Sequence, residues 1–177
     1  MVLVAGIGQA QPTRDTISLP DSLGSTWNDV CSLAAGDNDA RWAVGDSGKV
    51  LKMADGDTAA RYVIGKGQFD LCGVAFADPQ HGWIVGNKRD DPERGRGVIL
   101  RTTTGGDSPQ AWTAAFPVIR PSINVPFLQV QAVDAMRVWV TCGDGYELRS
   151  HDGGLNWLVG VKRPTVDAGG EIESERH

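Results

Sequence analysis

Side chains that could carry out chemistry recur in this sequence at a similar place in three related segments. A basic residue, Lys52, Arg101 or Arg149, follows the same short apolar stretch in each of them. Three clustered cations could bind a carboxylate, and Tyr146 beside Glu147 could form the tyrosine–glutamate pair of a glycoside hydrolase. Adjacent residues of a strand point to opposite faces, however, which separates the phenol from the glutamate. The simpler explanation, which we favour, is that the three cations are outward-pointing, solvated residues beside a turn.

The other potentially reactive side chains form no recognisable catalytic or ligand set. The histidines, His81, His151 and His177, lie in predicted turns or at the chain end, without a nucleophile beside them. Three cysteines occur without CxxC or zinc-site spacing, so neither a metal centre nor a disulfide framework is predicted. We therefore expect no catalytic residues, no bound metal and no cofactor.

The composition is that of a chain able to bury a core, with 41% hydrophobic and 22% charged residues. The net charge of -5 argues against general nucleic-acid binding, which usually needs a basic face. No apolar run reaches the roughly 18 residues of a membrane-spanning helix. Residues 1–10 are apolar and end in small residues, like the remnant of a secretory signal, which weakly favours a periplasmic or secreted protein. A short N-terminal strand would explain them equally well.

Three tryptophans mark an internal repeat, and an aspartate stands five residues before each of them. The tryptophans are Trp42, Trp83 and Trp139, and the aspartates are Asp37, Asp78 and Asp134. Apolar residues occupy alternate positions before each tryptophan, which is the period of a β-strand. In this alignment Cys31 and Cys72 fill the place of Leu128, so we expect both cysteines, like the tryptophans, in the core.

Each repeat continues through a glycine turn, a third strand that ends at the basic residue, a turn rich in Asp, Thr and Gly, and a fourth strand. Four antiparallel strands in about 45 residues, repeated, are typical of β-propeller blades. We predict an all-β chain of three four-stranded antiparallel repeats. The predicted segments are an N-terminal segment 1–26 with one possible strand, blades at 27–65, 66–117 and 118–162, and a flexible acidic tail 163–177.

The turn at 150–157 fits the Asp-box pattern, in which the conserved types are structural: Ser150, Asp152, Gly154, Asn156 and Trp157. The aspartate accepts backbone N–H groups, glycine allows positive φ, and the tryptophan packs beneath the turn. Together with Gly82-Trp83-Ile84-Val85-Gly86 and Ile99-Leu100-Arg101-Thr102, this turn resembles the BNR/Asp-box propellers, above all the photosystem II assembly/stability-factor-like family. The resemblance spans about residues 27–161 and implies a non-enzymatic lumenal or periplasmic binding protein.

Closed propellers have about four to eight blades, so three blades leave two open edges. Two interpretations remain open. Two chains could close one six-bladed ring as a homodimer, or the three blades could be part of a longer propeller.

The predicted recognition surface is formed by two long loops at one end of the blades. The insertion 87–96 offers charge of both signs, with four basic residues, Lys88, Arg89, Arg94 and Arg96, and three acids. The linker 117–127 offers Arg120 and exposed apolar residues, Ile119, Ile123 and Val125. Loops on a rigid scaffold are a common recognition device, although a solvated loop explains the insertion equally well. We predict a non-catalytic module that binds a protein partner through these loops. The alternative is a glycan-binding or sialidase-like propeller domain.

Overall fold

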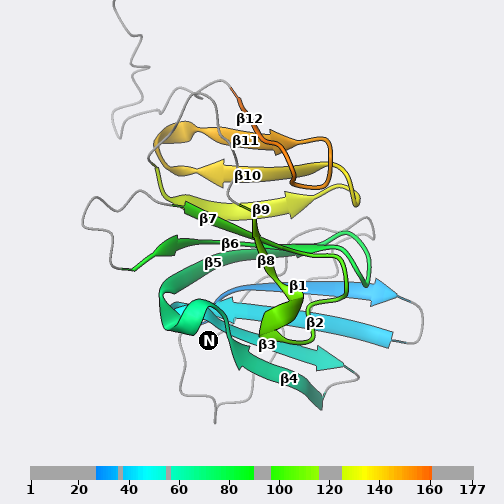
Figure 1. Ribbon diagram of the computed structural model, residues 1–177. Helices are drawn as coiled ribbons and strands as arrows, with labels where there is room; N and C mark the ends of the chain where they lie inside the picture. Colours follow the sequence, from blue (N-terminus) through cyan, green and yellow to red (C-terminus); the bar gives the residue numbers. More distant parts are fainter. Residues whose placement is uncertain (1–26, 36–37, 55–56, 90–96, 116–124, 161–177) are drawn as a thin grey trace, which may run out of the picture.

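The computed structural model describes residues 27–35, 38–54, 57–89, 97–115 and 125–160. In these segments the chain forms three four-stranded antiparallel sheets, each with its strands in sequence order, and four short 3-10 turns (Figure 1). The expectation of all-β propeller blades is confirmed. The N-terminal strand expected in 1–26 and the tail 163–177 lie outside the described residues.

Each sheet is one blade, and its strands run outward from first to last. Blade 1 contains β1 (Trp27–Ala35), β2 (Asn38–Gly45), β3 (Lys49–Ala54) and β4 (Asp57–Val63). Blade 2 contains β5 (Phe69–Phe76), β6 (Gly82–Lys88), β7 (Gly97–Thr102) and β8 (Thr113–Ala115). Blade 3 contains β9 (Phe127–Ala132), β10 (Val138–Cys142), β11 (Glu147–Ser150) and β12 (Leu158–Val159). The 3-10 turns are η2 (Asp46–Gly48), η3 (Gly65–Gly67), η4 (Pro109–Ala111) and η5 (Gly143–Gly145).

The first strands of the blades, β1, β5 and β9, lie beside one another. Gly73 in β5 permits this approach, since a Cβ atom there would lie only 3.0 Å from the Val130 nitrogen of β9. Between β1 and β5 the Val74 N–H donates a hydrogen bond of 2.9 Å to the Asp29 carboxylate. The convergence of first strands is the arrangement expected around a propeller axis.

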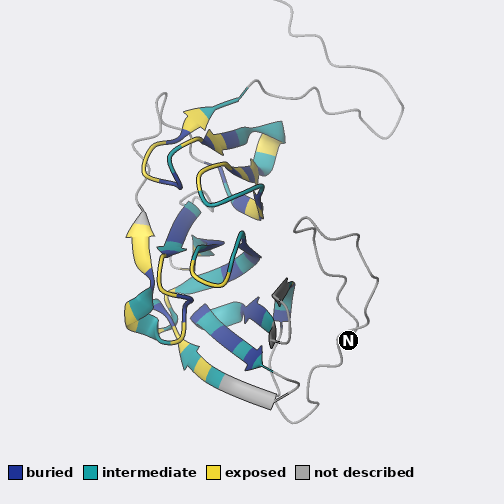
Figure 2. Ribbon diagram, turned by 90° about the vertical axis from the view of Figure 1, so that its right-hand side faces the viewer, coloured by how far each residue is buried: buried dark blue, intermediate teal, exposed yellow. Residues whose placement is uncertain are grey.

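Aromatic side chains fill the space between neighbouring blades, where Figure 2 shows the buried positions. Between blades 1 and 2, Trp42 stacks on Phe76 with ring centroids 3.8 Å apart, and Phe76 meets Trp112 edge to face. Between blades 2 and 3, the Trp83 Nε1–H donates to the Gly153 carbonyl oxygen at 3.0 Å, and Trp157 joins the same core. Burial of such aromatic groups is the main stabilising contribution at each interface.

Trp139 departs from the prediction that all three repeat tryptophans are core residues. It is 41% exposed, whereas Trp42 and Trp83 are at most 1% exposed. The reason lies in the fold: the face that carries Trp42 or Trp83 is covered by the next blade, and Trp139 occupies the outer face of blade 3. The cross-strand pair beside Trp139 is polar, Thr141 with Glu147. In the two covered blades the equivalent pairs are apolar: Val44 with Val50, and Val85 with Ile99.

The alignment of the first repeat was also wrong by three residues. Cys31 lies opposite Trp42, eleven positions away, whereas eight positions separate the residues opposite Trp83 and Trp139. Cys72 and Leu128 lie at β-bulges, where the pairing register shifts. The equivalent bulge residue in blade 1 is Asn28, not Cys31. An odd shift moves a side chain to the other face of a strand. Cys31 is nevertheless buried, Cys72 is half-buried and Leu128 is 48% exposed.

Candidate binding surfaces

Strand direction gives the three blades two distinct ends, as Figure 1 shows. The loop end carries the η2, η3 and η5 turns and the last residues of β6. The turn end carries the connections from first to second and from third to fourth strands, including the segments 102–113 and 150–158. The described ends of the two long loops, at β6, β7, β8 and β9, therefore lie at one end, and the Asp/Gly turns lie at the other.

The described bases of the two long loops lie against each other at the loop end. The Asn87 side-chain amide donates to the Phe127 carbonyl oxygen at 2.9 Å, and its oxygen accepts the Phe127 N–H at 2.8 Å. Gly97, which begins β7, approaches the Phe127 ring so closely that no side chain would fit there. Asn87 and Gly97, which flank the insertion, therefore both contact Phe127, the last residue of the linker.

Arg89 ties blades 1 and 2 together at this end. Its guanidinium bonds to the Ser47 hydroxyl of η2 and lies 3.3 Å from the Asp70 carboxylate, which also accepts the Ser47 N–H at 3.0 Å. The Arg89 N–H donates to the Gln68 carbonyl oxygen at 2.9 Å. Arg89 is still 46% exposed and Lys88 is exposed, so both face solvent at the base of the insertion.

The remaining predicted contact residues divide into two groups. Arg94, Arg96, Arg120, Ile119 and Ile123 lie outside the described residues. Val125, expected to be an exposed apolar contact, is 5% exposed and packs into the core between blades 2 and 3. It lies one residue before the Pro126 carbonyl that accepts the Gly143 N–H at 2.7 Å, which holds this stretch against η5.

Two of the recurrent cations differ in exposure: Lys52 is largely covered between blades, whereas Arg149 is half exposed, as expected for an outward-pointing residue. The Lys52 ammonium lies 5.2 Å from the Trp42 ring centroid and pairs with Asp107 of blade 2, with only 16% of its side chain exposed. On the outer face of blade 3, the Arg149 guanidinium lies 5.9 Å from the Trp139 centroid and bonds to Glu147. Each cation stands opposite the tryptophan of its own blade, a placement that favours cation–π attraction.

The turn at 150–157 is closed by hydrogen bonds to two side chains. The Ser150 hydroxyl accepts the Gly154 N–H at 2.8 Å, and Asp152 accepts the Leu155 and Asn156 N–H groups at 3.0 and 2.9 Å. Trp157 donates to the Gly154 carbonyl oxygen at 3.1 Å. Desolvation raises the pKa of Asp152, but hydrogen bonds from Asn156, Ser150 and Leu155 outweigh it and lower the pKa to about 2. Its role is to hold the turn.

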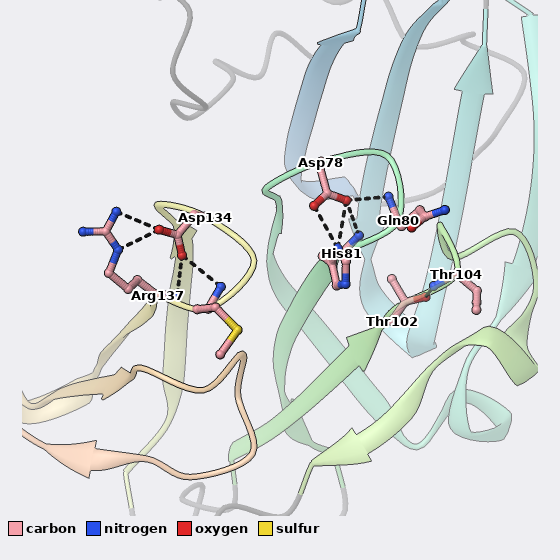
Figure 3. A network of polar contacts seen from close by, with 8 residues as sticks. Asp78, Gln80, His81, Thr102, Thr104, Asp134 and Arg137 are labelled. Carbon is pink, nitrogen blue, oxygen red and sulfur yellow. Dashed lines mark hydrogen bonds and ion pairs between the residues drawn. The ribbon is translucent and has the colours of Figure 1, made fainter.

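Aspartates at the repeat spacing also hold the first turns of blades 2 and 3, as Figure 3 shows. Asp78 accepts the Gln80 and His81 N–H groups at 2.8 Å each and lies 2.8 Å from His81 Nδ1. Asp134 accepts the Met136 and Arg137 N–H groups at 2.9 and 2.7 Å. The hydrogen bonds of Asp78, Asp134 and His81 are therefore made within these turns. His151 lies in the 150–157 turn and is exposed. Asp37 lies outside the described residues.

A hollow of about 360 Å³ opens on the outer face of blade 3. Trp139 and Tyr146 line it together with polar side chains from β9, β10 and β11: Gln131, Thr141, Glu147 and Arg149. The described residues contain no group of three or more His, Cys, Asp or Glu side chains arranged to hold a metal ion. They also contain no helix long and apolar enough to span a bilayer.

Comparison of this chain with solved structures also finds β-propellers. No protein-family model and no curated protein matches the chain. YCF48 from Cyanidioschyzon merolae superposes with a TM-score of 0.63 and 24% identity, over 85% of this chain and 44% of that one. A structure of YCF48 bound to D1 peptide superposes with a TM-score of 0.59 and 22% identity, over 76% and 39%.

These similarities establish the fold. The resemblance to photosystem II assembly-factor propellers seen in the sequence is confirmed at that level. The chain spans less than half of the length of either YCF48 structure.

Proposed function

We propose that this chain is a non-catalytic binding module that recognises a protein partner through the loop end of blades 1 to 3. The observation that carries the proposal is the fold it shares with YCF48, one structure of which holds a D1 peptide. A propeller supports many functions, so the surface must be argued from this chain's own residues.

The loop end supports the proposal because it combines a rigid base with long loops. Asn87, Gly97 and Phe127 fix the bases of the insertion and the linker against each other, and Arg89 fixes blade 2 to η2 of blade 1. Lys88, Arg94 and Arg96 then supply positive charge beside that base. The insertion carries both charges, because Asp90, Asp91 and Glu93 lie between its basic residues. Its lysine and arginine side chains, on a fixed scaffold, suit carboxylate groups of a partner protein.

The test is a binding measurement on an array of immobilised peptides that includes D1 peptides, with the triple variant Lys88→Ala, Arg94→Ala and Arg96→Ala. Arg89 is left in place because it joins two blades. We expect the peptides that the wild type retains to bind the triple variant about tenfold or more weakly, since charge-assisted contacts are lost.

The matched control removes three exposed positive charges away from the loop turns: Arg61→Ala, Arg137→Ala and Arg149→Ala. It should keep wild-type binding, and thermal unfolding should show both triple variants folded. Equal retention of every peptide by the wild type and the loop variant would refute the assignment of this surface.

A glycan ligand is the second candidate, and the hollow around Trp139 favours it. An exposed tryptophan beside amide, hydroxyl and carboxylate groups offers an apolar platform with polar groups that fix orientation. A glycan array probed with the wild type and with Trp139→Ala tests this candidate. Signals that disappear in the variant would support it, and an array without any signal would remove it.

A further inference from the structure

The two interfaces between blades carry the same kind of cation but different partners. Between blades 1 and 2, Lys52 stands opposite Trp42 and is neutralised by Asp107. Between blades 2 and 3, Arg101 stands opposite Trp83, at the place equivalent to Lys52. The turn of blade 3 that faces Arg101 provides no carboxylate at the place of Asp107.

Backbone geometry establishes which residues of the two turns are equivalent. The Gly105 N–H donates to the Gln80 carbonyl oxygen at 3.0 Å, as the Gly153 N–H does to the Met136 carbonyl oxygen at 2.8 Å. The glycine that follows has positive φ in both turns and approaches a tryptophan, Trp112 in one and Trp157 in the other. The next residue is Asp107 in blade 2 and Leu155 in blade 3.

Among the residues that the structure describes, Arg101 consequently has no counter-ion. Its Nε atom is buried and has no hydrogen-bond partner. The guanidinium forms no ion pair with the part of the chain that the structure describes, and it lies beside the Gly153 backbone, where a Cβ atom would come within 3.3 Å of it. A buried charged donor without a partner is costly, so this position favours an acceptor from outside.

A hollow of about 380 Å³ lies in front of Arg101 and could admit such an acceptor. Its polar wall consists of three side chains from blade 2, Thr103, Thr104 and Gln110. Leu155, 65% exposed, forms the opposite wall. Thr113 and Ala114 of β8 also line the hollow. β8 is the last strand of its sheet, and among the described strands it pairs only with β7.

We propose that this hollow, the Arg101 hollow, binds an extended peptide whose carboxylate takes the place that Asp107 fills at the other interface. A carboxylate matches the guanidinium fork, and the hydroxyl and amide groups opposite can bond to the peptide. The free edge of β8 offers backbone groups for an added strand, and Leu155 offers an apolar contact. The site lies at the turn end, so it is separate from the surface of the proposed function.

The first experiment titrates the wild type with three fluorescently labelled hexapeptides of alanine and threonine, followed by fluorescence anisotropy. One ends in a free carboxylate, one is its C-terminal amide, and one is an amide with a single internal glutamate. We expect the free acid, the glutamate peptide or both to bind at least about tenfold more tightly than the plain amide. Which of the two binds distinguishes a chain terminus from an acidic side chain. Equal affinity for all three would overturn the proposal.

The second experiment places a competing carboxylate in the site. Leu155→Asp supplies the counter-ion that Asp107 provides to Lys52 and should weaken the carboxylate peptide at least about tenfold. Leu155→Asn has the size of the aspartate variant without its charge and loses only the apolar contact, so it should bind the peptide at least about fivefold more tightly than Leu155→Asp does. Because Leu155 is mostly exposed, neither change threatens folding. A third variant, Arg101→Gln, removes the charge itself and should weaken the carboxylate peptide at least about tenfold. Unchanged affinity in Leu155→Asp would overturn the proposal even if Arg101→Gln failed to fold. The loop variant Lys88→Ala, Arg94→Ala and Arg96→Ala should bind these peptides normally, which separates this site from the proposed function.

Discussion

Asp29 is a carboxylate at the inner edge of blade 1, where β1 meets β5. It accepts the Val74 N–H at 2.9 Å, and burial there raises its pKa from 3.8 to about 6, although hydrogen bonds from the Val74 and Val30 backbone oppose the rise. The folded chain therefore retains the Asp29 proton at pH values where the unfolded chain has lost it. Above the folded-state pKa, the structure carries a buried charge at a contact between two blades.

We predict that Asp29→Asn stabilises the protein at neutral pH. The folded state binds more protons than the unfolded state between about pH 4 and pH 6, so the free energy of unfolding falls as pH rises through that window. Asparagine can still accept the Val74 N–H without a charge. The variant should gain about 1–3 kcal/mol at pH 7 and lose most of that pH dependence, measured by denaturant unfolding at several pH values.

Asp29→Ala is the informative comparison for this prediction. It removes the acceptor and leaves the Val74 N–H without a partner, so it should be less stable than Asp29→Asn by about 1–3 kcal/mol. An Asp29→Asn protein with the wild-type slope between about pH 4 and pH 6 would show that Asp29 is not the titrating group.

At the scale of the strand, the close approach of β5 and β9 depends on a residue without a side chain. A Cβ atom at Gly73 would lie 3.0 Å from the Val130 nitrogen, 3.1 Å from the Gln129 Cα and 3.1 Å from a Val85 methyl group. Two of these three neighbours are backbone atoms of another blade, which cannot rotate away. The position of blade 3 relative to blade 2 therefore rests partly on this glycine.

We predict that Gly73→Ala destabilises the fold by about 1–3 kcal/mol, because the added methyl group forces β5 and β9 apart. Equilibrium unfolding in guanidinium chloride, followed by tryptophan fluorescence, measures this change. A midpoint equal to that of the wild type would mean that the inner strands can move apart without cost.

At the scale of the whole molecule, the two outer blade faces are unlike. The outer face of blade 1 carries an apolar cluster, Trp27, Val30, Ala43, Leu51 and Met53, and all five residues are at most 7% exposed. The outer face of blade 3 is exposed and polar around Trp139, with Gln131, Thr141, Glu147 and Arg149. Terminal repeats of arrays often have such polar outer faces, which keep them in solution. The two faces therefore lack the apolar match that would close a six-bladed ring from two chains.

We predict that this chain is a monomer in solution, with a mass by light scattering that does not change with concentration. The double variant Thr141→Val and Glu147→Val restores the apolar pairs of the covered blades and should self-associate, because it enlarges an exposed apolar patch. A wild-type dimer that survives dilution would contradict this prediction and would favour the closed homodimeric ring.

Short-range patterns in the sequence were sufficient for the strands, the turns and the blade as a unit. Alternation around Trp83, glycines at tight turns and the Ser150–Trp157 turn each depend on a few neighbouring residues, so they can be read without knowledge of what packs against them. The first repeat shows the limit of short-range patterns. Its first hairpin places Cys31 opposite Trp42, eleven residues away, whereas Trp83 in the second repeat pairs with Ala75, eight residues away. The aligned repeats gave no sign of this difference.

The sequence by itself thus determined that this protein is a series of β-propeller blades. Only the tertiary structure decided which faces are covered: Trp42 and Trp83 are buried and Trp139 is not. It also decided that Lys52 pairs with Asp107, while Arg101 meets no carboxylate among the described residues. Val125, predicted to be exposed, is likewise buried because it packs between blades 2 and 3. The local pattern is alike in these repeats, but burial and charge pairing depend on side chains about 50 residues away in the next blade, whose identity no local periodicity encodes.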